Sequence, residues 1–176
     1  LAMAVRAGAS SKDMAFFQFH PTALMSDNKK PFLITEALRG EGGVLLDSKG
    51  LKKYRNSNLE PDELSFTLEF SKEGSLATRD VVARACDQKM KITGEDNVWL
   101  VTDHLDTQSL HDHFPTIEGR LNKLGLSLGR DPLPVAPAAH YMVGGLKVDI
   151  DGRVLMENGE AMPGLYGIGE VACTGM

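Results

Sequence analysis

Residues 14–22, Met14-Ala15-Phe16-Phe17-Gln18-Phe19-His20-Pro21-Thr22, join an apolar, aromatic run to a polar end. The run from Met14 to Phe19 predicts a β-strand, because aromatic side chains favour extended backbone. The strand leads into His20, and the ring of Pro21 restricts the backbone beside it. Alone, this histidine indicates either ordinary packing or a ligand-binding side chain held in place.

Strands and helices are expected in irregular order around this stretch, with glycine and proline marking the turns between them. Further strands are expected at residues 32–35, 98–101 and 164–170, the last one buried, and helices at 1–7, 76–91 and 115–125. Hairpins are expected around Ser48-Lys49-Gly50 and Asp151-Gly152, and a polar surface excursion at 55–75. The pattern predicts an α+β fold.

Composition excludes several classes of protein. The chain has 176 residues, is 42% hydrophobic and carries 19 Lys and Arg against 24 Asp and Glu, without a basic segment that would indicate nucleic-acid binding. Cys86 and Cys173 are far apart, which favours a reducing, cytoplasmic compartment over a disulfide framework. His104, His111 and His113 match no metal-ligand spacing. We find no apolar run long enough for a membrane helix and expect no metal.

Both ends of the chain fall inside expected elements. Leu1 lies in a helix-like segment, and Met176 directly follows a strand-like segment and a glycine. We therefore expect the chain to be a piece of a longer protein.

Two arginines and a glutamate stand out among the polar residues. Glu36 and Arg39 are spaced i, i+3, so one helical turn would place them on the same face. Arg79 lies at an expected helix start, where both the guanidinium and the helix N-terminus favour anions. Each feature alone also fits an ordinary ion pair or first-turn arginine.

Taken together, the polar residues describe a site for a small dianion beside a hydride-accepting cofactor. The set comprises His20, Thr35, Glu36, Arg39, Arg79 and His140. The chain contains no Gly-x-Gly-x-x-Gly motif, so a dinucleotide phosphate site is expected outside it.

Five motifs, in order, resemble the flavoprotein family of L-aspartate oxidase, fumarate reductase and the succinate dehydrogenase flavoprotein subunit. They are residues 17–22, 33–42, 78–85, 137–145 and 164–170. The resemblance covers nearly the whole chain and weakens between about residues 52 and 75. It is greatest to the aspartate oxidase branch.

The resemblance implies a fold and a cofactor. Residues 20–137 would form the capping domain of a two-domain FAD-dependent oxidoreductase, and residues 1–19 and 138–176 would be pieces of the FAD-binding domain. Glu170 would contact FAD. The family's N-terminal FAD-binding unit and a further substrate-binding arginine would lie outside the chain.

The resemblance also implies roles in converting L-aspartate to iminoaspartate, the first step of NAD biosynthesis, with fumarate or oxygen as electron acceptor. His20, Thr35 and His140 would bind the substrate. Arg79 would exchange a proton with the substrate carbon, with Glu36 and Arg39 as its relay. Association with quinolinate synthase is a further implication.

Two alternatives stay open. The parent protein could be a fumarate reductase or succinate dehydrogenase flavoprotein, with the same residues in the same places. The 176-residue chain by itself is expected to be inactive, and so to behave as a non-catalytic lid or interaction module.

Overall fold

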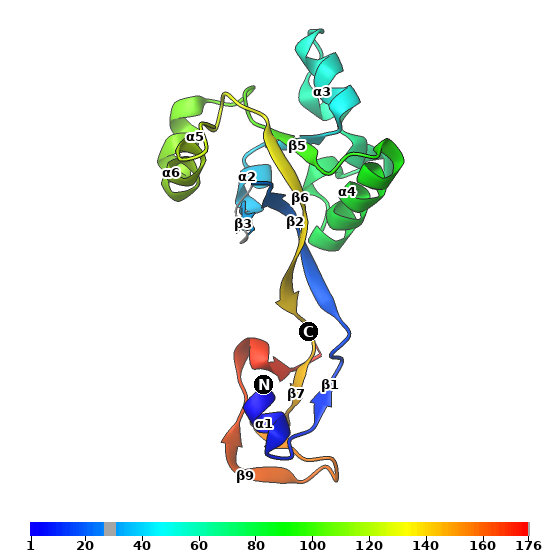
Figure 1. The fold of residues 1–176 in the computed structure, drawn as a ribbon, viewed down its shortest axis with the longest axis vertical. Helices are drawn as coiled ribbons and strands as arrows, with labels where there is room; N and C mark the ends of the chain where they lie inside the picture. The colour runs from blue at the N-terminus through cyan, green and yellow to red at the C-terminus, as the bar shows by residue number, and fades with distance from the viewer. Residues whose placement is uncertain (27–30, 176) are drawn as a thin grey trace. The chain divides into compact units, whose positions relative to one another are not determined.

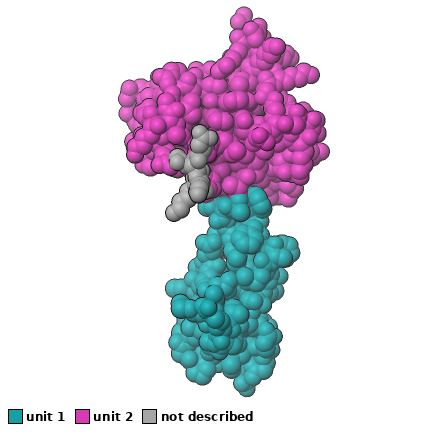
Figure 2. Space-filling view, viewed as in Figure 1, with its two compact units in different colours: residues 1–19, 139–176 teal, residues 20–138 magenta. Residues whose placement is uncertain are grey.

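The computed structural model describes residues 1–26 and 31–175, which form two compact units. Unit 1 comprises residues 1–19 and 139–176, and unit 2 comprises residues 20–138 (Figures 1 and 2). Each unit contains both helices and strands, so the fold is mixed α and β. No helix within the described ranges combines the length and apolar composition that a membrane crossing requires.

Unit 2 is built on a five-stranded sheet in the order β3-β2-β6-β5-β4. The strands are β2 (Phe17–Leu24), β3 (Phe32–Leu33), β4 (Val44–Leu46), β5 (Val98–Val101) and β6 (Leu133–Met142). Antiparallel pairing joins β2 to β3 and joins β5 to both β4 and β6. The sheet thus brings together segments from both ends of the unit.

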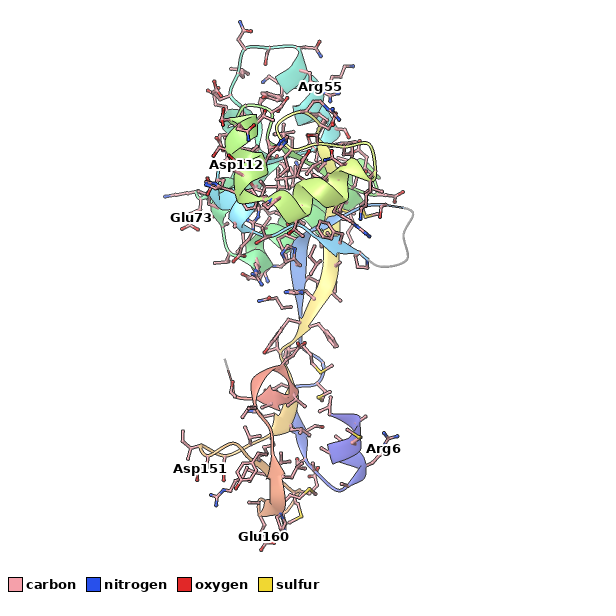
Figure 3. All side chains as sticks on the ribbon, turned by 90° about the vertical axis from the view of Figure 1, so that its left-hand side faces the viewer. Arg6, Arg55, Glu73, Asp112, Asp151 and Glu160 are labelled. Carbon is pink, nitrogen blue, oxygen red and sulfur yellow. The ribbon has the colours of Figure 1, made fainter. Side chains whose placement is uncertain are left out.

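Side chains of β4 and β5 alternate between two cores, as the pleat of a strand requires. Leu45, Val98 and Leu100 pack into the larger core, together with helices α4 (Arg79–Thr93), α5 (Thr107–His113) and α6 (Pro115–Asn122). The alternate residues of β4 and β5, whose side chains point to the opposite face of the sheet, pack into a smaller core with helix α3 (Ser48–Arg55). Charged side chains such as Arg55, Glu73 and Asp112 lie on the outside (Figure 3).

The hairpin expected at Ser48-Lys49-Gly50 is wrong, because these residues begin helix α3. Asp47 has extended backbone, and its carboxylate accepts a hydrogen bond from Gly50 N at 2.6 Å. This N-cap satisfies an amide that the first helical turn leaves without a partner. Basic residues in the last turn then favour the helix through its dipole, and β4 pairs with β5 instead.

The surface excursion expected at residues 55–75 is also wrong in part. Three short 3-10 helices occupy much of it: η1 (Pro61–Leu64), η2 (Phe66–Glu69) and η3 (Gly74–Leu76). Ser65, Phe66, Thr67 and Ser75 are buried there. Hydroxyl groups that hydrogen-bond to one another allow this polar sequence to pack inside.

The helices expected at 76–91 and 115–125 are confirmed. Helix α4 begins after Thr78 and ends at Gly94, whose φ of 72° suits a left-handed cap. Helix α6 begins at Pro115, where a missing N–H does no harm. A short helix, α2 (Ala37–Gly40), follows Glu36.

Strand β2 begins at Phe17, later than Met14, because a turn precedes it. Asp13 has a φ of 56°, and its carbonyl accepts a hydrogen bond from Phe16 N at 3.0 Å. The strand then continues beyond the expected histidine to Leu24, and it is buried from His20 onward.

Unit 1 contains a three-stranded sheet and a two-stranded sheet. The first has the order β1-β7-β10 and the second pairs β8 with β9. Their elements are α1 (Ala2–Arg6), β1 (Ser11–Lys12), β7 (Gly145–Lys147), β8 (Arg153–Leu155), β9 (Ala161–Tyr166), η4 (Gly169–Val171) and β10 (Ala172–Cys173). A small core around Leu146 and Val154 holds them together.

The turn at Asp151-Gly152 is confirmed, with a different geometry from the one expected. Gly152 has a φ of 75°, and the Asp149 carboxylate accepts hydrogen bonds from the amides of Asp151 and Arg153. The strand expected at 164–170 is confirmed only as far as Tyr166, where β9 ends, and its expected burial is wrong: Ile168 is 82% exposed in the described chain.

Candidate active site

One carboxylate between two guanidinium groups forms the centre of the site in unit 2. The Oε2 atom of Glu36 accepts a hydrogen bond from Nε of Arg79 at 2.5 Å. The same oxygen lies 3.9 Å from Nη2 of Arg39, the i, i+3 contact that the spacing predicts. Glu36 directly precedes α2, Arg39 lies within α2, and Arg79 is the first residue of α4. Two helix starts therefore bring the three side chains together.

Arg39 is a buried cation, 4% exposed. Its Nη1 atom donates hydrogen bonds to the carbonyl oxygens of Ser75 and, at 3.5 Å, Ala77. Its Nε atom is buried and has no hydrogen-bond partner among the described residues. Burial lowers the pKa of Arg39, and the charge of Glu36 opposes this shift. The backbone carbonyls and Glu36 together fix the orientation of this guanidinium.

Glu36 and Arg79 each favour the ionised form of the other. The hydrogen bond from Arg79 lowers the pKa of Glu36, and the charge of Arg39 acts in the same direction. The same hydrogen bond raises the pKa of Arg79. A guanidinium stays protonated in proteins, so two arginines beside one carboxylate leave one excess positive charge. Such a cluster attracts a carboxylate.

A pocket of about 280 Å³ opens beside these charges. It is lined by Glu36, Arg39, Gly40, Leu76, Ala77, Thr78 and Arg79. This volume is at the small end for ligand pockets, so it suits a ligand of few atoms. The pocket combines carboxylate-binding groups with an apolar wall at Leu76 and Ala77.

His20 and Thr35 also belong to unit 2. His20 is 3% exposed, and its Nδ1 atom accepts a hydrogen bond from Thr22 N at 3.3 Å. A neutral ring with this acceptor carries its proton on Nε2. Thr35 is exposed and directly precedes Glu36, and its hydroxyl accepts from Ala37 N at 3.4 Å. Their roles toward a substrate stay predictions.

His140 and Glu170 belong to unit 1. His140 lies on β6 and is exposed in the described chain. The Oε1 atom of Glu170 accepts a hydrogen bond from Met142 N at 3.1 Å, which fixes the carboxylate beside the turn that follows Ile168. Binding of substrate or FAD by these two residues stays a prediction.

The sequence did not indicate the backbone carbonyls of Ser75 and Ala77 as part of the site. A carbonyl is common to every residue, so no residue type marks it. The available signal was the proximity in sequence of these residues to Arg79, which begins the next helix.

Comparison with known proteins agrees with the motifs. A family model described as an FAD binding domain matches residues 1–176. The L-aspartate oxidase of Yersinia pestis is 43% identical over 176 residues, covering 100% of this chain and 30% of that protein. The L-aspartate oxidase of Acinetobacter baylyi is 42% identical and is covered over 29% of its length. The chain thus spans about a third or less of the curated relatives it matches.

A solved structure has the same fold. The chain aligns with an E. coli quinol fumarate reductase chain at a TM-score of 0.75 and 27% identity, covering 97% of this chain and 28% of that one. The relatives are L-aspartate oxidases, and the structural neighbour is a member of the same broader group. The chain belongs to the FAD-binding flavoprotein family that includes L-aspartate oxidases and fumarate reductases.

Proposed function

We propose that this chain is part of an FAD-dependent oxidase that converts L-aspartate to iminoaspartate. The observation that carries the proposal is the pocket at Glu36, Arg39 and Arg79, which has one excess positive charge for a carboxylate substrate. The aspartate oxidases that are 42–43% identical to the chain support this choice of substrate.

The substrate would be bound by its carboxylates. His20 and Thr35 would hold one carboxylate, and His140 would be a further donor to the substrate. The buried position of His20 and its bond from Thr22 N support a fixed ring that donates from Nε2. Fixed donors of this kind orient a small dianion without loss of side-chain freedom on binding.

Arg79 would exchange a proton with the substrate carbon. A free arginine is a poor base because its pKa is above about 12, and the contact with Glu36 raises the pKa further. Arg79 can therefore accept a proton only after passing one to Glu36 through the hydrogen bond between them. The Glu36 side chain is 47% exposed, so it can release that proton to water. Arg39 would hold Glu36 in place and keep its charge balanced.

FAD would supply the hydride acceptor when bound. Glu170 and the backbone of Gly169 fit a contact with such a group. Gly169 has a φ of 72°, and a Cβ built there would meet no atom within 4 Å, so its backbone is open to a flat ligand. The amide of Met142 fixes the Glu170 carboxylate next to this opening.

Unit 2 would be the capping domain of the parent enzyme, and unit 1 would be part of its FAD-binding domain. A cap that covers the reaction would exclude water from it. Since the chain spans about 30% of its relatives, we expect the 176 residues alone to be inactive. Cytoplasmic location and association with quinolinate synthase stay predictions.

The test uses the full-length protein that contains this chain, purified with FAD and kept anaerobic. L-aspartate and succinate are added separately, and loss of the oxidised flavin absorbance is followed. Bleaching by aspartate supports the proposal. Bleaching by succinate without bleaching by aspartate would assign the protein to the second candidate, a fumarate reductase or succinate dehydrogenase flavoprotein, a group to which the structural relative with a TM-score of 0.75 belongs.

A further inference from the structure

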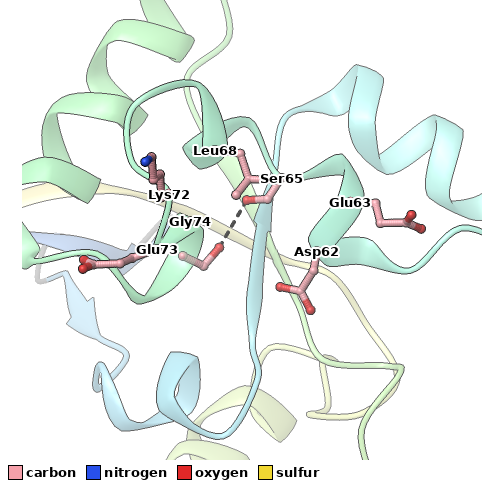
Figure 4. A pocket seen from close by; sticks show the side chains of 8 residues that line it. Asp62, Glu63, Ser65, Leu68, Lys72, Glu73 and Gly74 are labelled. Carbon is pink, nitrogen blue, oxygen red and sulfur yellow. Dashed lines mark hydrogen bonds between the residues drawn. The ribbon is translucent and has the colours of Figure 1, made fainter.

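Three buried hydroxyl groups lie next to the backbone segment whose carbonyl oxygens accept hydrogen bonds from Arg39. Ser65, Thr67 and Ser75 are 6%, 1% and 6% exposed. The Oγ of Ser65 lies 2.7 Å from the hydroxyl of Thr67 and 3.2 Å from that of Ser75. Figure 4 shows the second of these contacts as the dashed line from Ser65, in a pocket of about 350 Å³. We call these three residues the hydroxyl cluster.

The hydroxyl cluster is attached to the central sheet at one residue. Ser65 donates to the carbonyl oxygen of Leu45 at 2.8 Å, and Ser75 accepts from the amide of Leu45 at 3.0 Å. Leu45 is fully buried in strand β4. Both backbone groups of one core residue thus hold the cluster, so its position is fixed by the sheet.

The cluster has a consistent set of donors. Ser65 gives its proton to Leu45, so Thr67 can donate to Ser65, and Ser75 can donate to Thr67 across 3.4 Å. The Thr67 hydroxyl links the two serine hydroxyls and makes no hydrogen bond to a backbone group among those described. The role of the Thr67 hydroxyl is therefore to hold the two serine hydroxyls in position.

The segment from Ser75 to Thr78 connects the cluster to both arginines of the site. The carbonyls of Ser75 and Ala77 accept hydrogen bonds from the Arg39 guanidinium. After Thr78, the chain enters α4 at Arg79. One anchored segment therefore determines where both cations stand relative to Glu36.

We propose that the hydroxyl cluster of Ser65, Thr67 and Ser75 is a positioning element that sets the distance of Arg39 and Arg79 from Glu36. It acts through the 75–78 segment and touches no reacting atom. The inference rests on the proposed function for its catalytic consequence, whereas its effect on anion binding does not depend on that function.

The effect of the cluster is on the proton affinity of Glu36. The groups that face Glu36 are Arg79 on α4, Arg39 on α2 and His20 on β2, and the two arginines favour its ionised form, as a protonated His20 ring would. Displacement of the two arginines weakens their effect, so the pKa of Glu36 rises toward its ordinary value of 4.5. The pH at which the relay becomes protonated then moves upward.

The test compares Thr67→Val with the wild-type holoenzyme, in the full-length protein. Valine has a methyl group where threonine has its hydroxyl, so the substitution removes the hydrogen bonds of that hydroxyl. We expect kcat for aspartate oxidation to fall about 10- to 100-fold, since misplacement by about 1 Å costs up to about 100-fold. We expect KM to change little and the acidic limb of the kcat profile to move to higher pH. Thr67→Ser keeps the hydroxyl and is expected to restore the wild-type kcat and its wild-type pH profile.

The matched control is Thr102→Val. Thr102 is fully buried in the same unit, and its hydroxyl accepts from Gly129 N at 3.0 Å. Its loss orphans a backbone amide, so it should lower thermal stability at least as much as Thr67→Val. The kcat profile should keep the wild-type pH dependence. If Thr67→Val lowers stability and leaves that dependence unchanged, the proposal is overturned. Ser65→Ala and Ser75→Ala give the same comparison if Thr67→Val does not fold.

A binding measurement separates this inference from the proposed function. Methanedisulfonate is a dianion that does not titrate in the working range, and calorimetry gives its Kd as a function of pH. The pH at which Kd changes because Glu36 becomes protonated should be higher in Thr67→Val than in the wild type. If wild-type protein fails to oxidise aspartate and this shift is present, the proposed function fails and the positioning role stands. If that pH is the same in both proteins, the positioning role is overturned, whatever the substrate.

Discussion

The Nε–H group of Arg79 donates a hydrogen bond to the carboxylate of Glu36 at 2.5 Å, although 43 positions separate the two residues in sequence. Each partner stabilises the ionised form of the other, so the pair resists loss of either charge. In the proposed mechanism, a proton passes between them only when a substrate changes that balance. The pair is therefore the place where a single substitution is most informative.

Glu36→Gln is expected to lower kcat for aspartate oxidation by about 100-fold or more, the usual contribution of a proton-transfer group. KM should change much less, because the arginines that attract the carboxylate remain. Anaerobic stopped-flow reduction of the flavin measures both. Glu41→Gln, an exposed neighbour whose side chain lies near His113, is the control and should behave as wild type. Reduction of the flavin at the wild-type rate in Glu36→Gln would exclude a role for Glu36 in the proton relay.

Asp47 has two structural tasks that two substitutions can separate. Its carboxylate caps α3 at Gly50 N, and it lies 3.7 Å from Nζ of the buried Lys89. Asp47→Ala should lower the free energy of unfolding by about 1 kcal/mol for the cap alone, and by more because Lys89 keeps only Glu69 as an acidic partner among those described. Asp47→Asn retains a cap acceptor and should cost less. Urea unfolding distinguishes them, and equal losses would contradict the capping role.

Stability should depend on pH through Glu118. Burial raises the pKa of this carboxyl, but hydrogen bonds from Leu128 N and Ser127 Oγ and the charge of His111 outweigh it, so the pKa lies below its ordinary value of 4.5. A lowered pKa in the folded state means that the stabilisation is present above the unfolded-state pKa. It is lost as the pH falls through the folded-state pKa.

Glu118→Gln should therefore flatten the decrease in unfolding free energy on acidification below about pH 4.3, the unfolded-state value. Chemical denaturation at a series of pH values measures this slope. Glu73→Gln, an exposed substitution in the same unit, should leave it unchanged. A Glu118→Gln slope equal to that of the wild type would show that the hydrogen bonds do not depend on ionisation.

Cys86 should resist alkylation in the native protein. Burial raises the pKa of its thiol to about 12, and the nearby charge of Arg39 offsets this only in part. Since the thiolate is the reactive form, iodoacetamide at neutral pH should modify Cys86 only after unfolding. Peptide mass spectrometry of native and denatured samples checks this. Rapid native labelling would mean that the helix α4 core opens readily.

One contact of the candidate site could be predicted from the sequence, and the roles of its residues stay predictions. The i, i+3 spacing of Glu36 and Arg39 was sufficient to predict their contact, since it depends on one helical turn. The pairing of Glu36 with Arg79 depends on how two distant helix starts meet. Only the family resemblance suggested it in advance.

The errors have separate physical causes. Ser48-Lys49-Gly50 resembles a hairpin turn, but Asp47 provides a cap that makes the same residues a helix start. Part of the polar segment at 55–75 is buried because its hydroxyls hydrogen-bond inside the unit, and composition alone does not distinguish such hydroxyls from those of a solvated loop. Whether an apolar segment such as 164–170 is buried depends on neighbours that its own residues do not specify.

The order of strands in unit 2 also has a consequence during synthesis. Strand β2 lies beside β6 in the sheet, yet β6 begins at Leu133 and β2 ends at Leu24. During synthesis on the ribosome, the edge of β2 that pairs with β6 stays unpaired until β6 has been made. An unpaired edge of this kind is a site of aggregation. The strand that carries His20 is therefore exposed to misassembly for most of the time that unit 2 takes to emerge.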